Sequence, residues 1–239
     1  MENKDIEISQ SFYKDLLKGG TCQYKIGREP REPTLPMQKG LLFEFELIGS
    51  TRDGEETPAI LTSTGKESVH HSRTIEMANA AKPYLDELGF DLLEVQPSWR
   101  CDVDGMKWKG HPDLISSKGI ADIKYTEEAA SRSAWLRDWL DDSAKIQAVH
   151  YTIMSKEIVG RYLPFYFVVF FSWGGIEVIQ AEITQEVIDA YKSKVFELVS
   201  AYDPDKTSTN FNECAVCKVK DCAFKVTKPT IRKTLIDRI

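Results

Sequence analysis

The chain has 239 residues, of which 31 are basic and 37 acidic, giving a formal net charge of −6. This length suits one substantial core, or one core with a small appended module, because domains commonly hold about 100 to 200 residues. The acidic balance excludes attraction of nucleic acid by bulk charge, so any nucleic-acid site must be a local patch.

The chain begins with the polar stretch MENKDIEISQ, which lacks the basic and apolar regions of a signal peptide. No apolar run in the sequence approaches the roughly 20 residues that a bilayer span requires. We therefore expect a soluble, intracellular, cytoplasmic protein with no membrane partner. The sequence does not indicate an oligomeric state.

The first ninety residues predict helices separated by a proline-containing loop. Apolar residues recur at helical intervals over 5–18 and end at Gly19-Gly20, a common C-terminal stop. The segment GLLFEFELIG, 40–49, predicts either a helix start or a buried strand, because periodicity does not separate these for a short apolar run. Residues 66–88 predict a long helix that ends at Gly89 and can break near Pro83.

The middle of the chain predicts antiparallel hairpins. Residues 91–104, 106–117 and 119–126 are each typical of strands, and Asp104-Gly105 and Lys118-Gly119 are turn signals between them. These turns predict that the three segments are joined as antiparallel hairpins.

The second half predicts a helix, two strands and a helix. Residues 130–157 have a helical pattern that places Trp135 and Trp139 on one face. Residues 163–184 predict two strands about a Trp-Gly-Gly turn, and the first is apolar enough to be buried on both faces. A final helix over 184–202 leads into a polar linker and a cluster of cysteines.

Two aspartates and a lysine lie around the 116–119 turn. Asp113 ends one predicted strand, while Asp122 and Lys124 alternate on the next and therefore share a face. Paired across the hairpin, the two carboxylates repel each other unless a cation or a proton lies between them. Phosphodiester hydrolysis needs such a cation on carboxylate oxygens, and a lysine can position water or offset charge there. The alternative is a surface hairpin whose charged side chains are solvated.

Three motifs give these residues a family context. HPD, eight residues and then DIK, at 111–124, resemble the PD-(D/E)xK nuclease signature, and QAVHY, 147–151, is similar to the Q-x-x-x-Y motif of its RecB-like branch. KGLLFE, 39–44, is similar to the first family motif, with Gly40 and Glu44 matching. The resemblance implies an α/β fold with a restriction-endonuclease-like core, a mixed central sheet flanked by helices, in a single domain over 1–239.

The resemblance also implies an activity and a set of site residues. It implies a deoxyribonuclease, exonuclease or endonuclease, that uses Mg²⁺ or Mn²⁺ on single-stranded DNA or DNA ends, within a DNA-processing complex of recombination, repair, phage or CRISPR type. The implied metal ligands are Glu44, Asp113, Asp122 and the backbone carbonyl of Ile123. Lys124 would orient or activate water, and Gln147 and Tyr151 would position substrate or Lys124.

Two alternatives remain open at this point. Glu67, His70 and His71 are rivals to Glu44 as the third ligand, although we expect them on the polar face of their helix. A non-cleaving nucleic-acid-binding module of a larger complex, or an RNase, could carry the same motifs.

The cysteines predict a second metal centre. Cys214, Cys217 and Cys222 have C-x₂-C-x₄-C spacing, and Cys22 lies near the N-terminus, so four thiolates could bind tetrahedral zinc or an iron–sulfur cluster. The arrangement resembles the iron–sulfur RecB-like nucleases, including AddB-type and CRISPR-associated enzymes. It implies a 4Fe-4S cluster that joins 1–36 and 204–239 into a cysteine-cluster subregion, with zinc as the alternative. Cys101 is expected to be a small core residue.

Overall fold

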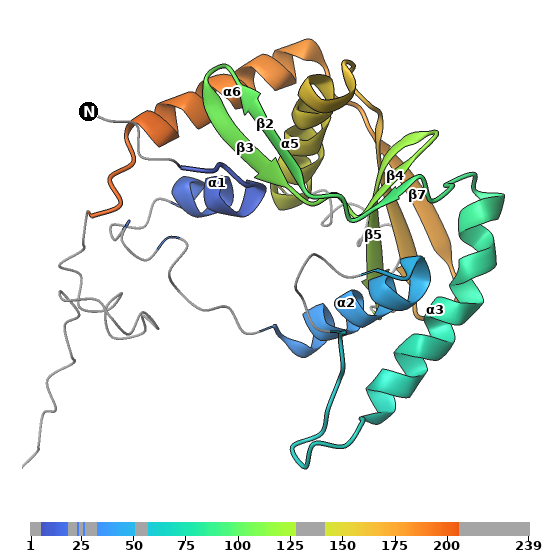
Figure 1. Ribbon diagram of the computed structural model, residues 1–239. Helices are drawn as coiled ribbons and strands as arrows, with labels where there is room; N and C mark the ends of the chain where they lie inside the picture. The colour runs from blue at the N-terminus through green and yellow to red at the C-terminus, as the bar shows by residue number, and fades with distance from the viewer. Residues whose placement is uncertain are drawn as a thin grey trace, which may run out of the picture.

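A mixed sheet of five strands lies at the centre of the structure (Figure 1). The structure is a computed structural model, and it describes residues 6–18, 23, 26, 33–50, 57–127 and 142–205. The strands, in spatial order, are β1 (Glu94–Val95), β4 (Leu114–Ser116), β5 (Gly119–Thr126), β6 (Phe165–Phe171) and β7 (Ile176–Ala181). Strands β5 and β6 are parallel and the other neighbours are antiparallel, so the sheet is mixed as predicted.

Helices cover both faces of this sheet (Figure 1). One face packs against α2 (Leu35–Ile48) and α3 (Val69–Glu87). The other face packs against α1 (Gln10–Leu17), α5 (Asp142–Val159) and α6 (Gln185–Ser200). Side chains alternate along β6, so Val168 and Phe170 join the first core while Phe167 and Val169 join the second. This double burial explains why the strand is apolar throughout, and the sequence prediction of it is confirmed.

A separate hairpin of β2 (Trp99–Val103) and β3 (Met106–Gly110) packs on α5. The predicted antiparallel hairpin about Asp104-Gly105 is confirmed. The strand-like stretches 91–104 and 106–117 are not continuous strands, because each crosses from one sheet to the other. The crossings contain Pro97 and Pro112, which have no N–H to donate to a strand ladder. The β4–β5 hairpin was predicted correctly, and Gly119, with φ 143°, is at its turn.

The helix boundaries follow local caps. The predicted 5–18 helix begins only at Gln10, because Ser9 caps it through a hydrogen bond from the Phe12 N–H at 3.1 Å. Residue Ile8 instead forms a parallel bridge with Trp108 at the edge of β3. The ambiguous segment 40–49 is helical and ends at Gly49, whose φ of 74° gives a left-handed cap.

Two further helices differ from the extents that the sequence predicted. Helix α3 continues through Pro83 to Glu87, because Ala78, Ala81 and Leu85 bury its face against the core. Helix α5 is described from Asp142, so part of the predicted 130–157 helix lies outside the described residues, as do Trp135 and Trp139. None of the helices in the described part of the chain has the length and apolar character needed to cross a membrane.

A buried histidine fixes α5 against the β2–β3 hairpin. The ring of His150 is fully buried and stacks on Trp108 with 4.7 Å between ring centroids. Its Nε2 lies 3.1 Å from the carbonyl oxygen of Lys109, and its Nδ1 lies 3.2 Å from the Tyr191 hydroxyl. A carbonyl can only accept, so Nε2 donates, and Nδ1 accepts from Tyr191 in the neutral ring. Burial lowers the pKa of His150 to about 4.

This histidine predicts a loss of stability in acid. Its pKa is about 4 in the folded protein and about 6.5 in an unfolded chain, so the unfolded state binds the proton first as pH falls. The stabilisation that neutral His150 gives the folded state is complete above pH about 6.5 and is lost toward pH 4. This loss lowers the free energy of unfolding by about 3 kcal/mol. We expect the free energy of unfolding, measured with urea, to fall less with pH in His150→Gln than in the wild type over this range. Equal dependence for the two proteins would contradict the assignment.

Candidate active site

The β4–β5 hairpin brings two buried aspartates side by side. Leu114 pairs with Ala121, so Asp113, just before β4, lies opposite Asp122 of β5. The side chain of Asp113 is tied to the neighbouring strand, because its Oδ2 accepts the Ile123 N–H at 2.8 Å. Asp113 and Asp122 are only 4% and 1% exposed. This hairpin is therefore not the solvated surface turn that the sequence left open.

The environment of Asp122 is strongly charged. Its Oδ1 accepts a hydrogen bond from the Gln147 side-chain amide, and its Oδ2 lies 2.5 Å from Lys124 Nζ. Among the described residues, this buried Oδ2 has an ion pair but no partner with hydrogen-bond geometry. Burial raises the pKa of Asp122 to about 7, with Asp113 adding to the rise and Lys124 opposing it. A second positive charge near Oδ2 would therefore be favourable.

Lys124 remains a cation in this site. Burial acts to lower the pKa of its amine, but the carboxylates of Asp122 and Asp113 outweigh burial, and the pKa is raised. Its side chain is 33% exposed, so the ammonium borders solvent while its partner Asp122 is buried. Lys124 can therefore donate hydrogen bonds to an incoming group but does not accept a proton near neutral pH.

The third predicted carboxylate, Glu44 of α2, is buried at the edge of this pair. Its Oε1 accepts a hydrogen bond from the Gln96 side-chain amide, and its charge contributes to the raised pKa of Lys124. One helical turn earlier, a Cβ at Gly40 would meet no atom within 4 Å, so this helix face is open. Among the described residues, no three His, Cys, Asp or Glu side chains are close enough to form a ready-made metal site. The structure thus brings Asp113 and Asp122 together and places Glu44 near Lys124, without completing a three-carboxylate site among the described residues.

The two α5 residues have different contacts. Gln147 contacts Asp122 directly. Tyr151, one turn later and 2% exposed, donates its hydroxyl to the carbonyl of His111 at 3.0 Å and accepts from the Gln10 side-chain amide at 3.1 Å. A Cβ at Gly110 would lie 2.4 Å from the Tyr151 ring, so glycine allows this approach. Tyr151 therefore holds the chain that leads into Asp113.

The rival ligands lie in a different environment. His71 is buried, and its Nδ1 accepts the Ile60 N–H at 3.3 Å, while its Nε2 lies 3.5 Å from Glu67. The expectation that His71 lies on the polar face of its helix is therefore wrong, because it packs the start of α3 against the preceding loop.

Neither Gln96 nor Gln10 was singled out from the sequence, since an isolated glutamine carries no local signal of its role.

The predicted cysteine ligands Cys22, Cys214, Cys217 and Cys222 lie outside the described residues. Cys101 is half-buried against the second core, and burial raises the pKa of its thiol to about 11. A thiol of this kind is a poor nucleophile near neutral pH. The expected structural role of Cys101 is therefore supported.

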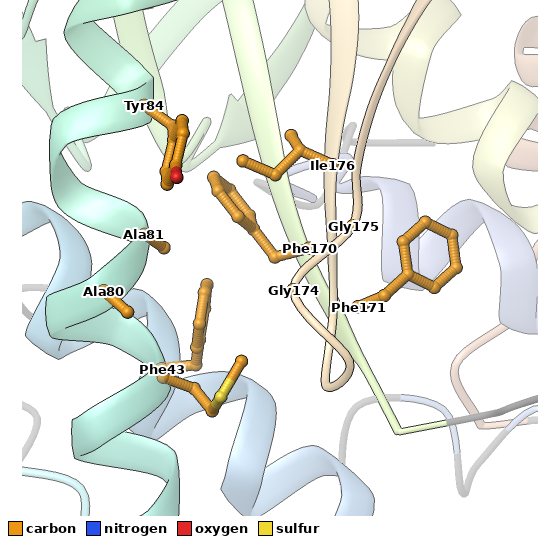
Figure 2. A pocket seen from close by; sticks show the side chains of 10 residues that line it. Phe43, Ala80, Ala81, Tyr84, Phe170, Phe171, Gly174, Gly175 and Ile176 are labelled. Carbon is orange, nitrogen blue, oxygen red and sulfur yellow. The ribbon is translucent and has the colours of Figure 1, made fainter.

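A separate apolar cavity lies between α3 and the β6–β7 turn (Figure 2). It contains about 480 Å³ of empty space, part of it open to solvent. Its lining residues are Phe43, Met77, Ala80, Ala81, Tyr84, Phe170, Phe171, Gly174, Gly175 and Ile176. Because this lining contains no carboxylate or basic side chain, the cavity lacks the groups for hydrolysis.

Comparison with known proteins supports the fold. A crystal structure described as a "Putative exonuclease" from Eubacterium rectale is similar, with a TM-score of 0.63 and 20% identity over 95% of this chain and 91% of that chain. An alkaline exonuclease from Laribacter hongkongensis has a TM-score of 0.43 and 15% identity, over 82% of this chain and 87% of that chain. No family model and no curated protein matches the sequence. The chain therefore has the mixed α/β fold of the first of these structures.

The Tyr151 hydroxyl provides a test of the site's support. We expect Tyr151→Phe to lower the free energy of unfolding by about 1–3 kcal/mol, because the part-buried carbonyl of His111 and the amide of Gln10 each lose a partner. The control Tyr84→Phe, at an exposed tyrosine of α3, should change it by less than about 0.5 kcal/mol. Urea unfolding measures both values, and equal small effects would show that the hydroxyl does not support the site.

Proposed function

We propose that this protein is a divalent-metal-dependent nuclease that hydrolyses phosphodiester bonds in DNA. The observation that carries the proposal is the buried pair of Asp113 and Asp122 with Lys124 Nζ 2.5 Å from Asp122 Oδ2. Burying two like charges side by side is costly, and a structural role alone does not require them. A hydrolytic site that binds a cation does require them.

The side chains of this site fit a hard divalent cation. All the candidate donors are oxygens, and one of them, Asp122 Oδ2, is buried with the Lys124 ammonium as its neighbour. When ionised, Glu44, Asp113 and Asp122 exceed the charge of Lys124 by two negative charges, which one Mg²⁺ or Mn²⁺ ion balances. The proposed ligands are these three carboxylates and the backbone carbonyl of Ile123. For all three carboxylates to reach one ion, Glu44 must move or bind through water.

The other residues have separate roles in the proposed reaction. A bound Mg²⁺ or Mn²⁺ would supply a water of lowered pKa and offset charge on the phosphate. Lys124, held as an ammonium, donates to the attacking water or to a phosphate oxygen and thereby offsets developing charge. Gln147 orients Asp122 through its amide, and Tyr151 positions the chain before Asp113. The open helix face at Gly40 gives the sugar-phosphate backbone room beside Glu44.

The substrate assignment is supported by resemblance. The motif order across Glu44, Asp113, Asp122 and Lys124 resembles PD-(D/E)xK nucleases of the RecB-like branch, and the fold is like that of a structure described as a "Putative exonuclease". Single-stranded DNA or DNA ends are the proposed substrate. The net charge of −6 means that DNA contacts must come from a local surface.

The central test is cleavage by charge-removing variants. We expect Asp113→Asn and Lys124→Met to lower the cleavage rate of end-labelled DNA in Mn²⁺ by about 100-fold or more, because each removes electrostatic stabilisation. Two matched variants on the exposed face of α6, Asp189→Asn and Lys194→Met, should cleave like the wild type. Circular dichroism checks that each protein is folded.

The substrate panel separates this proposal from its alternatives. Single-stranded DNA, duplex DNA and RNA are each incubated with Mg²⁺, Mn²⁺ or EDTA. Cleavage of DNA that EDTA abolishes supports the proposal. Cleavage of RNA alone would make the protein an RNase, and binding of DNA without any cleavage would make it a non-cleaving module.

We also propose that Cys22, Cys214, Cys217 and Cys222 hold a 4Fe-4S cluster, with zinc as the alternative. Their spacing is the support for this proposal, since three thiols within nine residues are typical of metal ligands. A structural metal contributes folding free energy, so Cys217→Ser should lose the metal and lower the thermal midpoint. Iron and zinc analysis of anaerobically purified protein measures the loss, with Cys101→Ser as the control. Equal metal content in both variants would contradict the proposal.

A further inference from the structure

Gln96 has an unusual backbone conformation. Its φ is 45°, and Asp104 is the other non-glycine residue with positive φ in the described part of the chain. Asp104 lies in the β2–β3 turn, where aspartate tolerates this conformation. Gln96 instead precedes Pro97, which restricts its backbone to extended conformations. Backbone strain of this kind costs about 1–3 kcal/mol and is often found at functional sites, where surrounding contacts maintain it.

The contacts of Gln96 explain what maintains the strain. Its backbone N–H donates to the carbonyl of Asp113 at 2.9 Å, and its side-chain Nε2 donates to Oε1 of Glu44. One residue therefore links the carboxylate on α2 to the chain segment that carries the first aspartate. These two acids are otherwise supplied by elements far apart in the sequence.

The oxygen of the same side-chain amide, Oε1 of Gln96, is the second unusual feature of this residue. The Oε1 atom of Gln96 is buried and has no hydrogen-bond partner among the described residues. A buried amide oxygen without a partner is costly, so it usually contacts an ordered water or a cation. Amide oxygen is a ligand type that Mg²⁺ and Mn²⁺ accept, and this one belongs to a side chain already bound to Glu44.

We propose that Gln96 is a positioning residue of the metal site: its Nε2 holds Glu44 beside the Asp113 and Asp122 pair, and its Oε1 coordinates the cation or accepts a hydrogen bond from one of its waters. This inference rests on the proposed nuclease function. A neutral amide suits this place, because the three carboxylates and Lys124 together carry two negative charges. One divalent cation already balances them. A glutamate at 96 would add an uncompensated negative charge.

The test measures metal binding without substrate. Gln96→Met keeps the side-chain length and the backbone strain but removes both polar atoms. Gln96→Gly removes the side chain and adopts positive φ without strain, so it is the variant expected to fold best. Titration with Mn²⁺, followed by electron paramagnetic resonance of the free ion, should show binding about 10- to 100-fold weaker in both variants. Cleavage by Gln96→Met should recover at high Mn²⁺ concentration.

The control is a surface glutamine that also donates its side-chain amide to a carboxylate. Gln185 of α6 donates its Nε2 to Asp189 Oδ1 at 2.8 Å on the surface, and Gln185→Met should bind Mn²⁺ like the wild type. Wild-type affinity in Gln96→Gly, or tighter binding in either Gln96 variant, would overturn the role of Gln96 while leaving the nuclease assignment intact. Absence of Mn²⁺ binding and cleavage in the wild type would instead overturn the proposed function and this inference together.

Discussion

The structure depends on the burial of two carboxylates next to each other. Asp113 and Asp122 come from adjacent antiparallel strands and are both almost inaccessible to solvent. Their repulsion is offset by an N–H from Ile123, the amide of Gln147 and the ammonium of Lys124. The N–H and the ammonium belong to β5 and the amide belongs to α5, and even together they leave the pKa of Asp122 raised.

Strand β5 makes this arrangement possible. Its alternate residues Ala121 and Ile123 pack into the core beneath α2 and α3, while Asp122 faces α5, which supplies Gln147. The whole strand, from Ile120 to Thr126, pairs with β6, and this ladder includes Asp122 and Lys124. The strained backbone of Gln96 and the close approach of Gly110 to Tyr151 then complete the surroundings. The charged side chains of β5 thus share one face of the strand with Ile120, which is buried in the core on that side.

Local signals predicted much of the fold. The β4–β5 and β6–β7 hairpins and α6 are where turn residues and hydrophobic periodicity placed them, because these patterns act over a few residues. The two crossings between sheets were missed, since a chain that remains extended keeps a strand-like pattern even when its partner changes. His71 was misplaced for a related reason: its burial depends on the loop containing Ile60, which periodicity within α3 does not report.

The sequence by itself determined which residues can carry the chemistry. Asp122 and Lys124 alternate on one strand, and a short turn returns that strand to Asp113, so their proximity follows from strand geometry alone. Only the tertiary structure decided that this cluster is buried, that Gln96 binds Glu44, and that Tyr151 supports His111. Those contacts join residues between 40 and 52 positions apart. They arise from how α2 and α5 pack against the sheet, and no local pattern encodes that packing.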